Sequence, residues 1–490
     1  MIPNKQKSNL INWEIVSVNP VDKNWLWTDL FCFWAVSIQS IIGFSLISSF
    51  YLIYDLNFFI VFAGGLIACL LAIFFSNLIG IPSQKYGLPF PVILRSSVGI
   101  NGAKYVALIR GLVGIFMFGV QTFFLSKSIG YLIRIFLFTQ NGNILDSEIL
   151  LSFLMGMNLI DWFAFILTLL IQYFLFSKGH KFLRSIIKFS AYFVYFGLSL
   201  FLILVMGENF TPVMNSLKLS LKFNDVISKS NLIPLVTVIG TFFAYFSILI
   251  VNFGDYSRYV KNKNELIKGN LSLLLNFILL SLFSILIVIG SDIILAKNSI
   301  PIESILVNPT DIIGKLNNTF LTVIVIIFIL TATASTNLIA NYIPSQNTLI
   351  NLLPSRLNLK SSGMTILFFS FFVGALWLPF LSQIGVLSFV DTLGSLFGPI
   401  FGIIVADFFL VRKLKINSND LFTANSDSVY FYTNGWQYKG LYSLLIGFIF
   451  SASTIWNINL NFLQSFSWII GALMSFIVYY LLASKQNAQI

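Results

Sequence analysis

Charged residues are scarce in this chain of 490 residues. Asp, Glu, Lys and Arg together make up only 10% of it, whereas a soluble globular domain has about 25%. This scarcity excludes an ordinary water-soluble domain. The remainder is rich in apolar side chains, at 57% with a mean hydropathy of +0.89, so the composition indicates an integral membrane protein.

Cysteine and histidine are nearly absent. The two cysteines, Cys32 and Cys69, both fall in long apolar runs, and no CxxC pair exists, so we expect no disulfide. The single histidine, His180, lies beside Lys178 and Lys181, where we expect a solvated loop. Catalytic Cys–His pairs and multi-histidine metal sites are therefore excluded, and we expect no cofactor of that kind.

Apolar runs of about 20 residues recur along the whole chain, which is the length a helix needs to cross a bilayer. Membrane strands would instead be short and alternating. The sequence therefore predicts an all-α membrane protein with twelve transmembrane helices. They cover about 27–53, 58–81, 103–137, 158–177, 185–206, 232–253, 266–296, 319–353, 361–381, 384–411, 438–457 and 464–483.

Domain organisation and orientation follow from the loops. We predict an N-terminal tail (1–24), one transmembrane domain (25–483) and a C-terminal tail (484–490), because the longest connections, 207–231 and 412–437, are too short for a separate core. Most of the 29 lysines and arginines fall on the side of the termini, which places both termini in the cytoplasm and the chain in the inner (plasma) membrane. The basic residues are dispersed, so we expect no nucleic-acid partner, and we expect a monomer.

Two predicted helices contain small and polar residues that suit an interrupted helix. The first has Ser37-Ile38-Gln39-Ser40 followed by Gly43, and the sixth has Gly240, Thr241, Ser247 and Gly254. A helix can break in a membrane only where a cavity, a ligand or another protein group satisfies the freed backbone. Close helix packing through small residues is the alternative for each of them.

The run from Ala332 to Asn341 places five hydrogen-bonding side chains in a membrane segment. In hydrocarbon, an unsatisfied polar group costs several kcal/mol, so this run must face protein, a cavity or an ion. Ala332, Ser335 and Thr336 share one helix face, and Asn337 and Asn341 share the next. The first face offers hydroxyl oxygens, which suit a hard cation, and the second offers carboxamides, which suit a neutral polar solute.

Other function classes fit less well. A membrane enzyme needs a nucleophile, metal ligands or an acid–base pair at one depth, and the sequence offers none. A channel predicts a continuous polar face, whereas the polar residues here gather near the middle of the membrane. A carrier with one central site fits best.

Several segments together resemble the nucleobase–cation symporter-1 family, over about Asn24 to Leu482. The matching motifs are Ser83-Gln84-Lys85-Tyr86-Gly87-Leu88-Pro89-Phe90-Pro91-Val92 with Arg95, Gly99, Gly102 and Ala103; Phe118-Gly119-Val120-Gln121-Thr122; Asp255-Tyr256-Ser257-Arg258; Ser335-Thr336-Asn337 with Ala340-Asn341; and Gly398-Pro399 through Asp407 and Arg412. The resemblance implies a LeuT-type fold, with a 5+5 inverted-repeat core over about 27–411 and two additional C-terminal helices over 438–483.

The resemblance also implies a sodium site between the first and eighth helices. Carbonyl and hydroxyl oxygens would hold Na⁺ as the coupling ion. The matching positions are Ala35, Ile38, Ala332, Ser335 and Thr336. A set of neutral oxygens suits a weakly bound monovalent cation, whereas tight Ca²⁺ binding needs formal charge. The alternative for the two hydroxyls is a bond to a carbonyl of their own helix.

Amides and aromatic rings form the family's substrate site. The matching positions are Gln39, Met117, Gln121, Phe246, Asn337 and Asn341. Carboxamides carry a donor and an acceptor, so they can read the edge of a nucleobase or hydantoin. The alternative for each amide is a bond between helices. The family's hydantoin transporter has tryptophan where this chain has Met117 and Phe246, so hydantoin specificity does not transfer.

These positions include no charged residue, which predicts a neutral heterocyclic substrate and favours Na⁺ over H⁺. We therefore expect a secondary active transporter that takes up a nucleobase, hydantoin or allantoin-like ring with Na⁺ by alternating access. Gating is expected from Ser388 to Leu393. The alternative within the same fold is a permease for a vitamin or nucleoside, such as a thiamine-like or pyridoxine-like compound, with H⁺ as a possible coupling ion.

Overall fold

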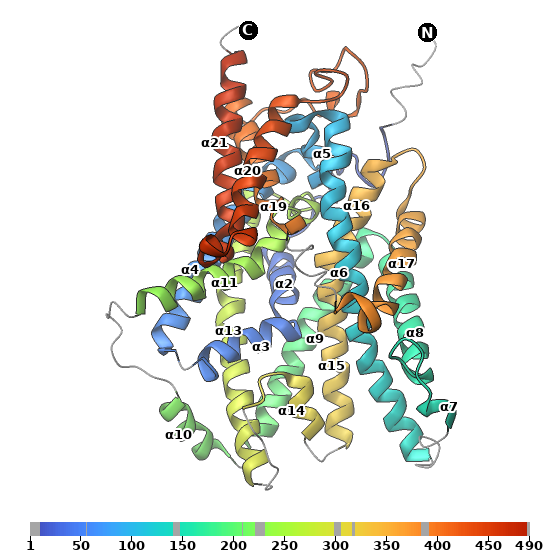
Figure 1. Cartoon of the computed structure of the whole chain (residues 1–490), viewed down its shortest axis with the longest axis vertical. Coiled ribbons are helices and arrows are strands. Elements are labelled where there is room, and N and C mark those ends of the chain that lie inside the picture. Colours follow the sequence, from blue (N-terminus) through green and yellow to red (C-terminus); the bar gives the residue numbers. More distant parts are fainter. Residues whose placement is uncertain are drawn as a thin grey trace.

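The structure is a computed structural model that describes residues 10–54, 56–140, 148–207, 209–220, 231–297, 305–315, 319–383 and 392–487. Most of the expected gating stretch, 388–391, lies outside these residues. The described part is helical throughout its spans, with isolated β-bridges in connecting segments. Both ends of the described chain lie at the same end of the molecule (Figure 1).

Long helices cross the molecule in every range where the sequence predicts a span. They are α2 (Trp27–Ile38), α3 (Ile41–Leu52), α4 (Phe58–Tyr86), α6 (Arg95–Gln140), α8 (Leu159–Phe176), α9 (His180–Met206), α11 (Leu232–Ile250), α13 (Lys263–Lys297), α15 (Thr319–Asn337), α16 (Ile343–Leu352), α17 (Leu359–Ala375), α19 (Phe397–Val405), α20 (Tyr438–Trp456) and α21 (Ser467–Asn487). Within the described residues, ten spans are long and apolar enough to cross a membrane, the bent pair α2–α3 adds an eleventh, and α17 is a shorter apolar helix.

Shorter elements connect these helices. They are η1 (Pro20–Asp22), α5 (Phe90–Ile93), α7 (Glu148–Leu151), α10 (Phe210–Ser220), α12 (Gly254–Ser257), α14 (Pro309–Lys315), η7 (Asp420–Phe422) and η8 (Ile458–Phe466), with single π-helical turns at η4 (Leu338–Tyr342), η5 (Trp377–Leu381) and η6 (Ala406–Val411). The predicted connection 207–231 therefore includes a short helix, α10. Val213 and Leu217 are spaced i, i+4, and α10 uses this face to pack against α13.

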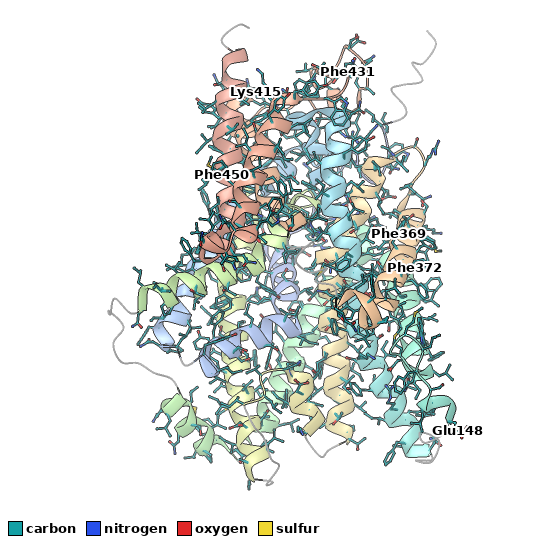
Figure 2. All side chains as sticks on the ribbon, in the orientation of Figure 1. Glu148, Phe369, Phe372, Lys415, Phe431 and Phe450 are labelled. Carbon is teal, nitrogen blue, oxygen red and sulfur yellow. The ribbon has the colours of Figure 1, made fainter. Side chains whose placement is uncertain are left out.

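Phenylalanine side chains cover the outside of the molecule at the level of the spans. Phe369, Phe372 and Phe450 are each about half exposed and point outward, whereas Lys415 and Glu148 lie toward opposite ends (Figure 2). In water this arrangement would be costly, but in a bilayer the apolar belt meets acyl chains. The fold is therefore that of a multi-span membrane protein, as the composition predicts.

The N-terminal segment packs across the end of the bundle where both termini lie. The backbone N–H of Val18 donates to the carbonyl of Gly87, which caps α4, at 2.9 Å. The Asn12 amide donates to the carbonyls of Pro354 and Leu357, just beyond α16, at 2.8 and 2.7 Å. This segment therefore joins elements that are distant in the sequence.

Two sequence expectations about single residues have different outcomes. Both cysteines are buried and unpaired, so the expected absence of a disulfide between them is confirmed. His180 is not a solvated loop residue, because it begins α9 and its ring stacks on Tyr259, with the ring centroids 5.0 Å apart. The sequence could not reveal this contact, since the two residues lie far apart along the chain.

Candidate substrate and sodium site

The first span is broken, which is one of the two alternatives that its small and polar residues allow. α2 ends at Ile38, α3 begins at Ile41, and the two are bent by 70° relative to each other (Figure 1). The Ser40 hydroxyl caps α3 by accepting from the N–H of Gly43 at 3.0 Å. A hydrogen bond of 2.8 Å from Tyr245 on α11 satisfies the carbonyl of Ser37, and the same phenol lies 2.9 Å from the Ser40 hydroxyl. The protein therefore supplies partners for the backbone that the break exposes.

The sixth span behaves differently. α11 runs without interruption through Gly240, Thr241 and Ser247, so these residues do not break the helix. The two hydroxyls bond carbonyls of their own helix, Thr237 and Ala244, at 2.9 and 2.8 Å. The helix ends only at Ile250, shortly before α12. Packing through small residues, the alternative for this segment, fits α11 better than a central break.

The hydroxyl face of α15 meets the broken end of α2. The Thr336 hydroxyl lies 2.8 Å from the Val36 carbonyl on α2 and 2.9 Å from the Ala332 carbonyl on its own helix. Three oxygens from two helices thus converge at one point. The Ser335 hydroxyl instead bonds carbonyls of its own helix, those of Thr331 and Ala332, at 2.7 and 3.0 Å.

The other two predicted sodium ligands are backbone groups of α2. Ala35 and Ile38 are buried near the break, and the Ala35 carbonyl accepts from the N–H of Gln39 at 2.9 Å. The oxygens near Thr336 are all neutral, which fits a monovalent cation. For an ion to bind there, the Thr336 hydroxyl would have to turn its proton away and present a lone pair.

The amide face of α15 forms a continuous chain of hydrogen bonds. The Asn341 amide donates to Gln121 on α6 at 3.1 Å and to Asn337 at 2.9 Å. Asn337 in turn donates to the side chain of Gln172 on α8 at 3.0 Å and to the Thr122 hydroxyl at 3.2 Å. Three of the predicted substrate residues, Gln121, Asn337 and Asn341, are therefore brought together.

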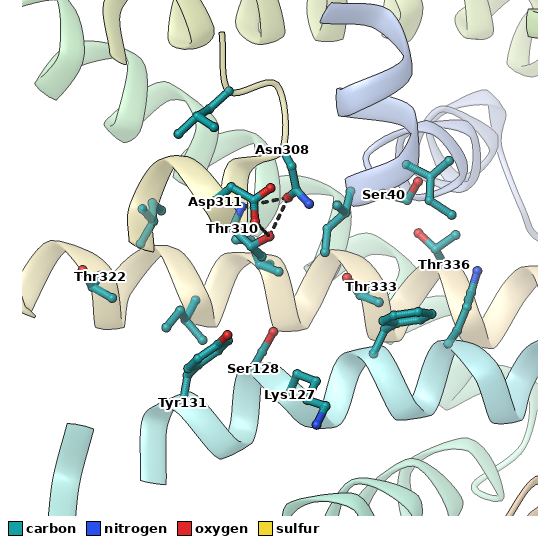
Figure 3. A pocket seen from close by; sticks show the side chains of 18 of the residues that line it. Ser40, Lys127, Ser128, Tyr131, Asn308, Thr310, Asp311, Thr322, Thr333 and Thr336 are labelled. Carbon is teal, nitrogen blue, oxygen red and sulfur yellow. Dashed lines mark hydrogen bonds between the residues drawn. The ribbon is translucent and has the colours of Figure 1, made fainter. Parts of the chain in front are cut away.

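A cavity of about 920 Å³ opens between α6, α14 and α15. Figure 3 shows it from close by, with Ser40 and Thr336 near one end and Asn308, Thr310 and Asp311 joined by hydrogen bonds. Gln121 also lines it, so one end of the amide chain and one hydroxyl of the sodium candidate border the same space. The charged residues on this cavity are Lys127, Asp311 and Lys315.

The remaining predicted substrate residues lie apart from the amide chain. Gln39 is buried, borders a smaller cavity and donates to the Ala191 carbonyl on α9 at 3.4 Å. Phe246 is buried with its edge against Tyr245, at 5.6 Å between ring centroids. Met117 is partly buried against the hydrophobic core. None of these three borders the cavity of 920 Å³.

Sequence reasoning missed two residues of this region. Gln172 is buried on α8 and bonds Asn337 and Thr122, and Tyr245 holds the break between α2 and α3. A single amide in the apolar run Leu159–Phe176 was a visible signal for Gln172, because a buried amide needs partners. Tyr245 gave no comparable signal, since tyrosine is common in membrane helices.

A family model for permeases of cytosine and purines, uracil, thiamine and allantoin matches residues 17–483. The chain belongs to this permease family. The resemblance predicted from its motifs is thereby confirmed, and the protein is a transporter and not an enzyme. The allantoin permease of Bacillus subtilis is 25% identical over 98% of this chain and 94% of its own length.

Two solved structures share the fold. A nucleobase–cation-symport-1 family transporter in a closed conformation, with bromovinylhydantoin bound, superposes with a TM-score of 0.72 at 19% identity and covers 98% of this chain and 96% of its own. A Na⁺-coupled sialic acid symporter in an outward-open state superposes with a TM-score of 0.62 at 12% identity and covers 94% and 90%. This permease therefore has the predicted LeuT-type fold.

Proposed function

We propose that this permease is a sodium-coupled symporter that carries a neutral heterocycle across the membrane by alternating access. One observation carries the proposal: Gln121, which ends the amide chain, and Thr336, which faces α2, border the same cavity. Solute and ion would then bind close enough to favour the same conformation. Such shared preference is what coupling requires.

The chemistry of the amides supports a flat ring as the solute. Nucleobases, hydantoins and allantoin present alternating N–H and C=O groups at their edges, and a carboxamide can match either. Gln121, Asn337 and Asn341 carry no charge, so the bound ring would be neutral. The names of the family and of the Bacillus relative agree with this substrate class.

The chemistry of the α2–α15 contact supports sodium as the coupling ion. The proposed ligands remain the carbonyls of Ala35, Ile38 and Ala332 with the hydroxyls of Ser335 and Thr336. One sodium charge that crosses the membrane contributes about 2.3 kcal/mol per 100 mV, in addition to its concentration gradient. We place the protein in the inner membrane with both termini in the cytoplasm, so that this energy drives uptake.

An uptake experiment with purified protein in liposomes tests the proposal. Radiolabelled uracil, cytosine, allantoin, hydantoin, thiamine and pyridoxine are offered under an inward Na⁺ gradient, with choline replacing Na⁺ in a parallel series. We expect a neutral ring to accumulate only with Na⁺. Accumulation driven equally well by a proton gradient in choline would contradict sodium coupling, and uptake of thiamine or pyridoxine alone would favour the vitamin alternative.

Replacement of one hydroxyl tests the ion site directly. Thr336→Val should raise the Na⁺ concentration for half-maximal uptake about tenfold, because the loss of one polar ligand costs on the order of 1.4 kcal/mol. Thr331→Val is the matched control, since that hydroxyl bonds its own helix at Ile327 and is exposed. An unchanged sodium dependence in Thr336→Val would remove this residue from the site.

A further inference from the structure

In the amide chain, each side chain donates through its nitrogen and accepts through its oxygen in a fixed order. This order is set by residues that do not line the cavity of 920 Å³. We infer that Thr122 and Gln172 are positioning residues that fix which atoms Gln121 and Asn341 present to a solute. The inference rests on the proposed function, because the direction matters only if a ring binds at this place. Gln172 does not border the cavity of 920 Å³, so it would act through Asn337 and not by contact.

The direction starts at a backbone carbonyl. The Phe118 carbonyl can only accept, and it accepts from the Thr122 hydroxyl at 2.7 Å. A hydroxyl has one proton, so every other group close to the Thr122 oxygen must donate to it. The side-chain amides of Gln172 and Asn337 lie 3.1 and 3.2 Å from that oxygen, and both must therefore turn an N–H toward it.

Asn337 is held in the same sense by two further acceptors. Its nitrogen also lies 3.3 Å from the Phe118 carbonyl and 3.0 Å from the side-chain oxygen of Gln172, so its two N–H groups are shared among three acceptors. The reverse orientation would place the Asn337 oxygen against these oxygens and leave buried acceptors without donors. The side chains of Thr122, Gln172 and Asn337 are buried, and Gln172 also borders a second cavity, of about 550 Å³.

The orientation then passes to Gln121, which lines the cavity of 920 Å³, through Asn341, which lies one hydrogen bond behind that lining. Because the Asn337 nitrogen points to Thr122, the Asn337 oxygen points to Asn341. The Asn341 amide nitrogen therefore donates to this oxygen, at 2.9 Å. The same nitrogen donates to the oxygen of Gln121 at 3.1 Å. Two atoms remain at the end of the chain without a partner among the described residues: the nitrogen of Gln121, a donor, and the oxygen of Asn341, an acceptor.

A donor beside an acceptor selects a particular ring edge. A carbonyl oxygen would face Gln121, and an adjacent ring N–H would face Asn341. Lactams and ureides have this edge, whereas a ring methylated at every nitrogen beside a carbonyl leaves the Asn341 oxygen unpaired. A site built to bond an N–H rejects analogues that lack it. If the chain could reverse, Asn341 could turn its nitrogen outward and much of this rejection would be lost.

The test compares pairs of rings that differ only in whether their two ring nitrogens carry hydrogen or methyl. The probes are uracil with 1,3-dimethyluracil and hydantoin with 1,3-dimethylhydantoin, each used to compete with uptake of the best labelled substrate in liposomes. The quantity measured is the ratio of the two inhibition constants within a pair. We expect a ratio of at least about tenfold in the natural protein.

Two variants each remove one hydrogen-bond partner that fixes the orientation of the Asn337 amide. Gln172→Met keeps the length of the side chain without its polar atoms, and Thr122→Val keeps the shape without the hydroxyl. Each should lower the ratio to about threefold or less, because Asn337 loses an anchor. Thr122→Ser restores the hydroxyl and should restore the ratio. Thr168→Val is the matched control, since this buried hydroxyl one turn away on α8 bonds only the Ala164 carbonyl.

The outcomes separate the inference from the proposed function. A purely structural role of Gln172 and Thr122 would reduce the amount of protein or the maximal rate for both rings, with the ratio unchanged, and that result would overturn the inference alone. A lowered ratio in only the two loosened variants supports it. If the natural protein takes up and binds none of the rings, the proposed function fails and the inference fails with it.

Discussion

Gly43 and Gly240 occupy related places, in the first and sixth spans, but their missing side chains make room for different things. A Cβ on Gly43 would lie 2.1 Å from the Ile38 carbonyl, which belongs to the same broken span. A Cβ on Gly240 would lie 2.6 Å from Ser465, in the segment η8 of another span. The first glycine therefore permits a chain break, and the second permits close packing of a continuous helix.

The difference between the two spans lies in what their polar groups bond. In the first span, the Ser37 carbonyl and the Gly43 N–H find partners in Tyr245 and Ser40. In the sixth, Thr241 and Ser247 bond their own helix. Small and polar residues therefore permit a break, but a break forms only where other groups take over the freed hydrogen bonds.

Among substitutions in these two spans, Gly43→Ala should have the largest effect on uptake and on the unfolding temperature. The obstacle is a backbone oxygen at 2.1 Å, which cannot rotate away as a side chain could, so the break itself must shift. We expect uptake to be lost and the unfolding temperature of the detergent-solubilised protein to fall. The matched control is Gly394→Ala, because nothing lies within 4 Å of the added atom there. Equal behaviour of the two variants would contradict this account of the break.

A smaller effect is expected from Gly240→Ala. The added methyl group meets Ser465 and Phe466, so the cost is that of overpacking, about 1–3 kcal/mol, while α11 stays helical. The variant should lower the unfolding temperature and leave the sodium dependence of uptake unchanged. A shifted sodium dependence would show that α11 takes part in the broken region after all.

Tyr245→Phe removes the link between the two spans. The carbonyl of Ser37 then loses its donor, which costs about 1–3 kcal/mol when the group stays dry and less when water replaces the phenol. We expect a lower unfolding temperature together with weaker sodium dependence, because α2 carries proposed ion ligands. Retention of both properties would indicate that the break does not depend on α11.

The smallest effect is expected from Ser247→Ala. This hydroxyl bonds only the Ala244 carbonyl of its own turn, and that carbonyl is already part of the helix. The change in unfolding free energy should stay within about 0.5 kcal/mol, and uptake should be unaffected. A large loss of transport would mean that Ser247 has a role that the continuous helix does not explain.

The sequence predicted features that depend on local spacing. The two faces of α15 follow from the helical repeat, and the structure places Thr336 against α2 and Asn341 against Gln121 as separate sets. A cluster of small and polar residues likewise marked the place where the first span breaks, although it left close packing open as the alternative. These predictions needed no knowledge of which helices are neighbours.

Features that depend on distant neighbours escaped the sequence. Gln172 and Asn337 are 165 positions apart, so no local pattern could pair them. Whether Ser335 turns toward α2 or back to its own helix is decided by the packing of α15, and here it turns back. The continuous course of α11 through Gly240 was hidden for the same reason, because the glycine's partner lies near the C-terminus.

The N-terminal segment gives the end of the bundle where both termini lie a mechanical property. Through Val18 it holds the cap of α4, and through Asn12 it holds the chain beyond α16, so it acts as a strap across two parts of the transporter. Any movement that separates α4 from α16 at this end must either stretch the strap until these three hydrogen bonds break or pull the segment along with one side.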